Sequence, residues 1–173
     1  PKSVNAVDRL SFIGKRAIGA LEFQPAHIQE DASINIELSS LYELANRLFL
    51  DRQDVNIDMS NNLIMEDLYK VGTSAGGQRP KAIIGMDEDT GIIRSGQADL
   101  PPNFKHYILK FDTSKQNEPP CTKVEMAYYL MAKDAGINMM PSKLVEIEGR
   151  QNFLTQRFDR HNGKKIHTQT LAA

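Results

Sequence analysis

The second half of the chain constrains the fold most, because it alternates short apolar segments with turn residues. Segments rich in β-branched and aromatic residues are bounded by glycine, proline and aspartate, which is the pattern of strands joined by turns. One stretch in this half has helical spacing instead. The pattern predicts a mainly antiparallel sheet with one helix packed against it. We expect strands at 81–86, 92–93, 106–111, 144–147, 153–157 and 166–168, and a helix at 122–135 with apolar positions Val124, Ala127, Tyr128, Met131 and Ala135.

The first part of the chain carries helical patterns. Apolar residues recur at three- and four-residue spacing between 38 and 49, which predicts an amphipathic helix. A shorter helix is expected at 63–70, ending at Gly72. Two short apolar segments, 10–13 and 20–23, suggest a small hairpin around 14–19. The fold class is therefore α+β, with a hairpin and helical subdomain at 1–71 and a sheet domain with one helix at 72–173.

Composition excludes several classes of function. The chain has 173 residues, 40% hydrophobic and 25% charged, which suits one domain or two small subdomains sharing a core. A net charge of −1 lacks the basic footprint of a nucleic-acid binder, so we expect no strong direct nucleic-acid binding. No apolar run or signal peptide points to a membrane, and we expect a cytoplasmic protein. The chain starts and stops abruptly, so we expect a piece of a longer protein.

The segment GTSAGGQRPK, residues 72–81, has the composition of a phosphate-binding loop. Small residues let backbone N–H groups turn toward an anion, but glycine is equally common in plain turns. Gly72 and Gly77 have the spacing of a Walker loop, yet Gln78 stands where lysine is required. Ser74 stands where the kinase glycine-rich pattern has its second glycine. Spacing alone favours a plain turn and leaves a phosphate role open.

Lys110 is unusual because it lies inside an otherwise apolar strand. An ammonium group is costly to bury unless it is paired. The strand could be at the edge of the sheet with its lysine in water. However, the helix that follows carries Glu125 on its first turns. A strand lysine followed by a helix glutamate is the order of the protein-kinase pair that holds the ATP phosphates.

Other candidate sites are weaker. The acidic segment 87–91 lacks calcium-loop spacing, because Gly91 falls one position early and Ala98 replaces the required glutamate. We therefore interpret it as a hairpin turn. The histidines show no metal-ligand spacing, and Cys121 is the only cysteine, so we expect no metal site or cysteine nucleophile. No segment supplies the catalytic base or the metal-binding aspartate of a kinase.

Six motifs occur in one order along the chain: RLSFIG at 9–14, GALEF at 19–23, the loop at 72–81, YILKFD at 107–112, TQRFDR at 155–160 and HTQTL at 167–171. Together with Glu125 in its helix, they resemble the HipA family of bacterial toxin kinases, and the resemblance extends from about Asp8 to Ala173. It implies a kinase N-lobe-like fold for residues 72–173. It also implies that the chain lacks an N-terminal subdomain and the catalytic C-terminal lobe.

The resemblance implies a role for each matching residue. Lys110 matches the lysine that contacts the ATP phosphates, and Glu125 matches its helix partner. Ser74 matches a serine whose autophosphorylation drives the loop out of the nucleotide site. The phosphate-loop residues are Gly76, Gly77, Gln78 and Lys81, and the hinge that holds adenine is Gln156, Arg157 and Phe158, with glutamate in many relatives where Gln156 stands here.

The resemblance further implies a protein serine/threonine kinase, the toxin of a toxin–antitoxin system. The full enzyme would use ATP with Mg²⁺, whose ligands are expected mainly beyond residue 173. Its partners would be a DNA-binding antitoxin and a protein substrate such as an aminoacyl-tRNA synthetase. The chain alone is expected to be inactive. Two alternatives remain, a non-catalytic module that docks an antitoxin and an unrelated nucleotide-binding domain.

Overall fold

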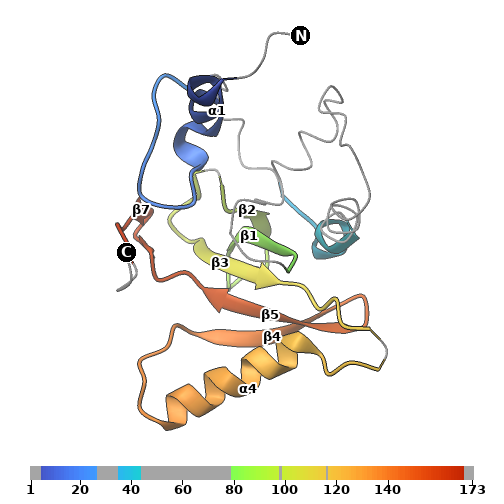
Figure 1. The fold of residues 1–173 in the computed structure, drawn as a ribbon. Helices are drawn as coiled ribbons and strands as arrows, with labels where there is room; N and C mark the ends of the chain where they lie inside the picture. Colours follow the sequence, from blue (N-terminus) through green and yellow to red (C-terminus); the bar gives the residue numbers. More distant parts are fainter. Residues whose placement is uncertain (1–4, 27–34, 44–78, 98, 116, 170–173) are drawn as a thin grey trace.

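The computed structural model describes residues 5–26, 35–43, 79–97, 99–115 and 117–169 (Figure 1). The predicted helix at 63–70 and the loop residues Ser74, Gly76, Gly77 and Gln78 lie outside these ranges. The subdomain boundary predicted at residue 71 also lies outside them and stays a prediction.

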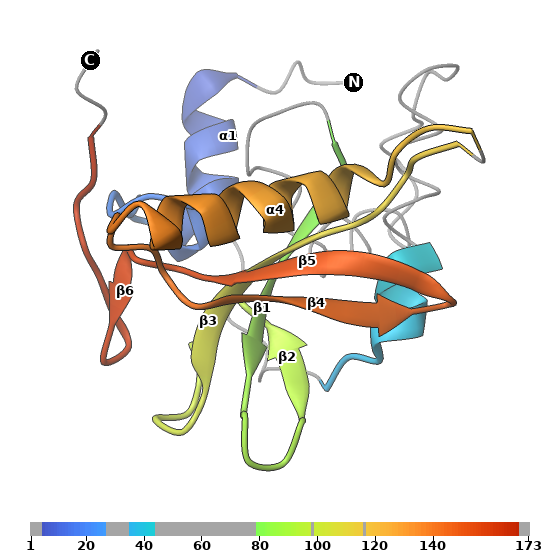
Figure 2. The same cartoon turned by 90° about the horizontal axis from the view of Figure 1, so that it is seen from below.

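A five-stranded antiparallel sheet forms the centre of the described chain, which confirms the predicted α+β class. Its strand order is β2-β1-β3-β5-β4, and one helix, α4, packs on β4 and β5 (Figures 1 and 2). The bounds are β1 Lys81–Met86, β2 Ile93–Ser95, β3 Lys105–Lys110, α4 Cys121–Asp134, β4 Ser142–Ile147 and β5 Arg150–Gln156.

The two faces of the sheet have different partners because strand side chains alternate between faces. Tyr107 and Leu109 belong to the buried core, which includes Leu41. Residues 38–43 are helical, as predicted, and Leu41 is 1% exposed. The next residue, Tyr42, meets Phe111 edge to face at 5.6 Å between ring centroids. Lys110 points to the opposite face, where α4 lies.

The predicted N-terminal hairpin is wrong. Residues Ala6–Ile13 form helix α1, followed by the 3₁₀ turn η1 at Gly14–Arg16. Asn5 and Asp8 form a capping box, in which each side chain accepts a hydrogen bond from the other residue's backbone N–H, at 2.9 and 3.0 Å. This cap satisfies N–H groups that would otherwise lack partners, and it favours a helix over an extended segment.

The predicted strand at 166–168 is also wrong, because a hairpin forms just before it. Strands β6 Arg160–His161 and β7 Lys164–Lys165 are joined by Asn162 and Gly163, with φ of 48° and 73°. Both turn residues are left-handed, which is the requirement of a type I′ hairpin turn and the reason for the Asn-Gly pair. After the turn, Lys164 and Lys165 pair with the first strand, and the Ile166 N–H donates one more bond to the Asp159 carbonyl at 3.0 Å before the chain leaves the hairpin.

Helix α4 is confirmed, but the apolar stripe that predicted it does not face the sheet. Val124, Tyr128 and Met131 are 42%, 67% and 63% exposed. The sheet instead covers Thr122 and Tyr129, at 1% and 8% exposure. The helix therefore presents mainly apolar side chains to solvent over the described residues.

Candidate functional site

Lys110 and Glu125 form an ion pair between the sheet and α4. The lysine Nζ lies 2.6 Å from Glu125 Oε2, and 5.6 Å from the centre of the Phe153 ring. About one third of each side chain, 33% and 35%, is exposed. Exposed pairs of this kind contribute at most about 1 kcal/mol to stability. The pair is thus accessible to a ligand and can rearrange at small cost.

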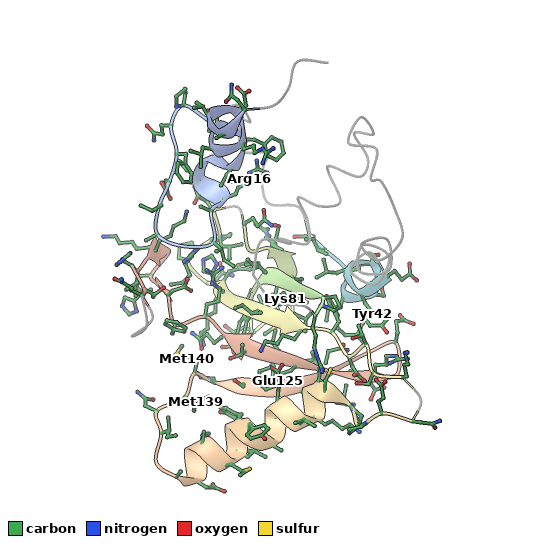
Figure 3. The ribbon with its side chains drawn as sticks, in the orientation of Figure 1. Arg16, Tyr42, Lys81, Glu125, Met139 and Met140 are labelled. Atoms are coloured by element: carbon green, nitrogen blue, oxygen red, sulfur yellow. The ribbon has the colours of Figure 1, made fainter. Side chains whose placement is uncertain are left out.

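A second lysine, Lys81, belongs to the same group. Lys81 on β1 is directly opposite Lys110 on β3, so both side chains leave the same face of the sheet. Burial lowers the pKa of Lys81, and the charge of Lys110 lowers it further, while Glu125 opposes the shift. Figure 3 labels Lys81, at the start of β1, and Glu125, on α4. The two ammonium groups can donate hydrogen bonds to an anion that binds on this face of the sheet.

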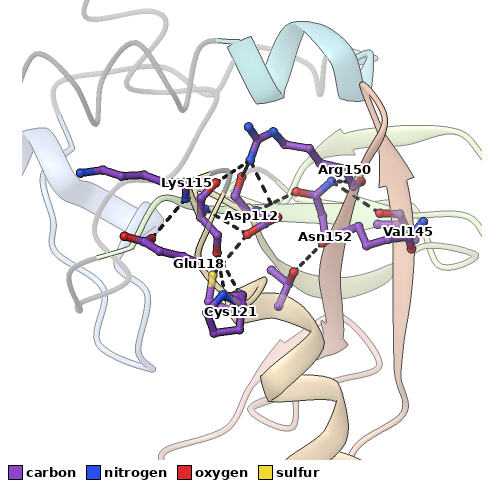
Figure 4. A network of polar contacts seen from close by, with 11 residues as sticks. Asp112, Lys115, Glu118, Cys121, Val145, Arg150 and Asn152 are labelled. Carbon is purple, nitrogen blue, oxygen red and sulfur yellow. Dashed lines mark hydrogen bonds and ion pairs between the residues drawn. The ribbon is translucent and has the colours of Figure 1, made fainter.

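A polar network fixes the start of α4, and with it the position of Glu125 (Figure 4). Asp112, directly after β3, accepts a hydrogen bond from Ser114 N–H at 3.1 Å. Ser114 Oγ in turn accepts one from Cys121 N–H at 3.0 Å, which caps the helix. Arg150 donates to the Ser114 carbonyl at 3.1 Å. The loop between Lys110 and Glu125 is therefore anchored at both ends.

Asn152, which the sequence analysis missed, supports this network from β5. It is 0% exposed, and its Oδ1 accepts from Asp112 N–H at 2.9 Å while its Nδ2 donates to the Arg150 carbonyl at 2.9 Å. An amide directly before the apolar Phe153 and Leu154 was the available signal, because buried polar side chains are normally hydrogen-bonded.

The predicted hinge residues follow β5 in sequence. Gln156 N–H donates to the Pro141 carbonyl at 3.0 Å, beside β4, and Arg157 N–H donates to the His106 carbonyl at 2.9 Å, beside β3. In an antiparallel sheet, two hydrogen-bonded opposite residues each donate an N–H to the carbonyl of the other. Pro141 has no N–H and therefore cannot donate to the Gln156 carbonyl. The Gln156 carbonyl is thus left available on that side. Phe158 is 66% exposed.

The side chain of Arg157 has a structural partner. Its guanidinium, 3% exposed, donates to both carboxylate oxygens of Asp159 at 2.8 and 2.7 Å and to the Ile18 carbonyl at 2.7 Å. Arg160 donates to the same carbonyl at 3.0 Å. Only the backbone of Arg157 can therefore take part in a hinge.

The remaining predicted sites have plain surroundings. The turn at 87–91 joins β1 to β2, as predicted, and Asp87 accepts hydrogen bonds from Asp89, Thr90 and Asn103. Cys121 Sγ lies 3.6 Å from Asp112 Oδ1. Within the described residues no three His, Cys, Asp or Glu side chains cluster as metal ligands would. None of the helices in the described part of the chain is long and apolar enough to cross a membrane.

The sequence was also compared with known protein families. Residues 73–173 match the model of the HipA-like C-terminal domain. The chain belongs to this family, which implies kinase chemistry with ATP as the donor. Searches of curated proteins and of solved structures gave no match.

Proposed function

We propose that this chain is the nucleotide-binding part of a HipA-like protein serine/threonine kinase, the toxin of a toxin–antitoxin system. The observation that carries the proposal is the group of Lys81, Lys110 and Glu125 on the α4 face of the sheet. Lys110 would contact the ATP phosphates, Glu125 would orient Lys110, and Lys81 would add a second positive charge. ATP fits this group because its phosphate oxygens accept charge-assisted hydrogen bonds from lysine ammonium groups.

With the ATP phosphates at Lys81 and Lys110, the adenine ring would bind at the proposed hinge, residues 156–158. An adenine could donate its amino group to the Gln156 carbonyl, which Pro141 leaves available, and accept from Phe158 N–H. This uses backbone groups and requires nothing of the Arg157 guanidinium. The residues of the loop, Gly76, Gly77 and Gln78, would cover the phosphates from the segment before Lys81. Mg²⁺ would be bound mainly by residues beyond 173.

Ser74 would be the regulatory residue of the site. A phosphate on Ser74 adds about −1.5 to −2 charges at neutral pH. Such a charge would compete with the phosphates of ATP for Lys81 and Lys110. The partners expected from the family are a DNA-binding antitoxin and a protein substrate, such as an aminoacyl-tRNA synthetase, phosphorylated on serine.

Calorimetric titration of the longer gene product with Mg-ATP tests the proposal, because the Mg²⁺ ligands are proposed to lie mainly beyond residue 173. We expect Lys110→Ala to weaken binding by about 10- to 100-fold, the range for loss of a hydrogen bond to a charged group. Lys123→Ala is the matched control, since Lys123 is an exposed lysine of α4 outside the group, and it should bind within about twofold of wild type.

Two further results separate the rival classes. A non-catalytic docking module predicts no Mg-ATP binding by the wild type, which would refute the proposal. An unrelated phosphate loop predicts binding that Glu125→Gln leaves unchanged. We expect Glu125→Gln to weaken binding, because the neutral amide no longer holds Lys110 beside the opposing Lys81.

A further inference from the structure

The outer side of α4 is an apolar stripe that no described element covers. Helix α4 packs on β4 and β5, and Figures 1 and 2 show it at the boundary of the molecule with the sheet on one side of it. The stripe on the opposite side consists of Val124, Ala127, Tyr128, Met131 and the capping residue Ala135, all of them exposed. An exposed apolar patch of this kind is typical of an interaction site.

The spacing of the stripe is that of a helix that packs on another helix. Val124 and Met131 are seven positions apart, with Ala127 and Tyr128 between them at three and four. Recurrence at three and four positions makes one continuous apolar line along a helix, as in coiled coils. The partner that fits this stripe is therefore a second amphipathic helix.

A charge lies beside each end of the stripe, and both charges are on the same side of the helix. Lys123 and Asp134 are eleven positions apart, which places them about 20° apart around the helix axis and about 16 Å apart along it. Both residues are exposed, and neither side chain forms an ion pair with another described residue. A lysine at one end and an aspartate at the other complement the same two residues of a helix that runs in the opposite direction.

An antiparallel second copy of α4, related by a two-fold axis, satisfies both charges at once. The same sides of two such helices meet, so Lys123 lies beside the second copy's Asp134, and Asp134 beside the second copy's Lys123. A lysine near the start of a helix and an aspartate near its end oppose the dipole of that helix, but each would lie at the favourable end of the second copy. The two charges are therefore better explained by a partner helix than by α4 alone.

The register that pairs these charges also fits the apolar side chains together. The two-fold axis crosses α4 midway between the two charges, next to Tyr128. At a rise of about 1.5 Å per residue, Val124 is then level with the gap between the second copy's Met131 and Ala135. Ala127 is within about 3 Å of the level of the second copy's Tyr128, so a small side chain meets a large ring.

We propose that the chain forms a homodimer through α4, with the two stripes in contact and Lys123 paired with the second copy's Asp134. Helix α4 has 14 residues and is about 21 Å long, so the contact belongs at the small end of specific interfaces. The dimer is therefore weak and reversible, with a dissociation constant on the order of 10–100 μM. It involves neither Lys81 nor Lys110, and its absence would leave the proposed kinase function unaffected.

Sedimentation equilibrium of the longer gene product without nucleotide, between about 5 and 300 μM, tests the proposal. We expect the average mass to rise with concentration toward that of a dimer. Lys123→Glu and Asp134→Lys each turn both attractive pairs of the dimer into repulsive ones and should raise the dissociation constant about fivefold or more. The variant with both changes restores the opposite charges and should return to within about twofold of wild type. A protein that stays monomeric, or a double variant as weak as the single ones, would refute the proposal.

A third variant and two matched controls locate the contact on α4. Met131→Glu places a charge within the stripe and should raise the dissociation constant about tenfold or more. Val7→Glu on α1 is its control, because Val7 and Met131 are 68% and 63% exposed. Lys164→Glu on β7 is the control for charge reversal, and both controls should stay within about twofold of wild type. Equal losses in a variant and its control would show unspecific association and overturn the proposal.

Discussion

Asn152 shows how one buried amide can hold the loop after β3 against β5. Its side chain is 0% exposed and bonds to the backbone of Asp112 and Arg150. If the Asn152 side chain were removed, the Asp112 N–H and the Arg150 carbonyl would each lose a hydrogen-bond partner that water could not replace. A buried amide of this kind stabilises the fold chiefly because the backbone groups that it bonds would be costly to bury without a hydrogen-bond partner.

Asn152→Ala should lower the free energy of unfolding by about 2–3 kcal/mol, since it leaves a buried N–H and a carbonyl unpaired. Urea denaturation monitored by circular dichroism measures this. Gln151→Ala is the control, because the Gln151 side chain donates a hydrogen bond to Glu146 at the surface, and it should change stability by less than about 0.5 kcal/mol. Similar values for both variants would show that the network does not constrain the fold.

His106 should make stability depend on pH in a defined window. Its pKa is lowered to about 4 in the folded protein, whereas an unfolded histidine titrates near 6.5. Between these values the unfolded state binds more protons, so stability falls as the pH falls from about 6.5 to 4. The groups that act on His106 are Arg160, Arg157, Asp159 and Asp99.

The expected loss across this window is about 3 kcal/mol, from a difference of about 2.5 pKa units. His106→Gln removes the titration and should flatten this part of the profile in urea denaturation between pH 4 and 7. The carboxylates titrate equally in both proteins, so the difference between the profiles isolates His106. Identical slopes would contradict the prediction.

At the scale of elements, α4 presents two neighbouring tyrosines to different environments. Tyr128 is 67% exposed and Tyr129 is 8% exposed. Tyr129→Ala should destabilise the protein by about 3 kcal/mol, as expected for a large buried aromatic side chain, and Tyr128→Ala by less than about 0.5 kcal/mol. Thermal unfolding of the two variants at about 1 μM, where the proposed dimer is dissociated, provides the comparison. A large loss for Tyr128→Ala at this concentration would mean that the stripe is covered within a single chain.

The same helix shows what periodicity can and cannot predict. The spacing of Val124, Tyr128 and Met131 correctly predicted a helix, but not which of its sides meets the sheet. The side that packs on the sheet carries Thr122 and Tyr129, and it is determined by tertiary contacts with β4 and β5. Near the N-terminus, apolar content suggested a hairpin, whereas the local Asn5 capping box decided for a helix.

The candidate site was partly predictable from the sequence, because some of its contacts follow from chain order and others depend on strand pairing. Chain order was sufficient to suggest that Lys110 and Glu125 form a pair, because a strand lysine followed by a helix glutamate is the order of the protein-kinase pair. The pairing of Lys81 with Lys110 depends on strand register, which only the structure gives. The Arg157 guanidinium could not be placed from sequence, since its partner Ile18 is 139 positions away.

At the scale of the whole molecule, that distant contact joins the N-terminal segment to the end of the sheet. The Ile18 carbonyl accepts from Arg157 and Arg160, and Lys165 lies 2.9 Å from Glu22. These bonds connect residues 14–23 to β5 and the β6–β7 hairpin. They also fix both guanidiniums beside the carboxylate of Asp159.

Arg157→Lys should loosen this connection, because a lysine cannot bond to both oxygens of Asp159 and to Ile18 in the same geometry. Losing about 1.4 kcal/mol of local stability would increase amide hydrogen exchange about tenfold in peptides covering residues 14–23. Strand β1 should exchange within about twofold of wild type. Arg150→Lys is the matched control, since Arg150 bonds to the Ser114 carbonyl instead and should affect residues 112–121. If both variants accelerated the same peptides, or neither changed residues 14–23, the Ile18 contact would not be what holds the N-terminal segment to the sheet.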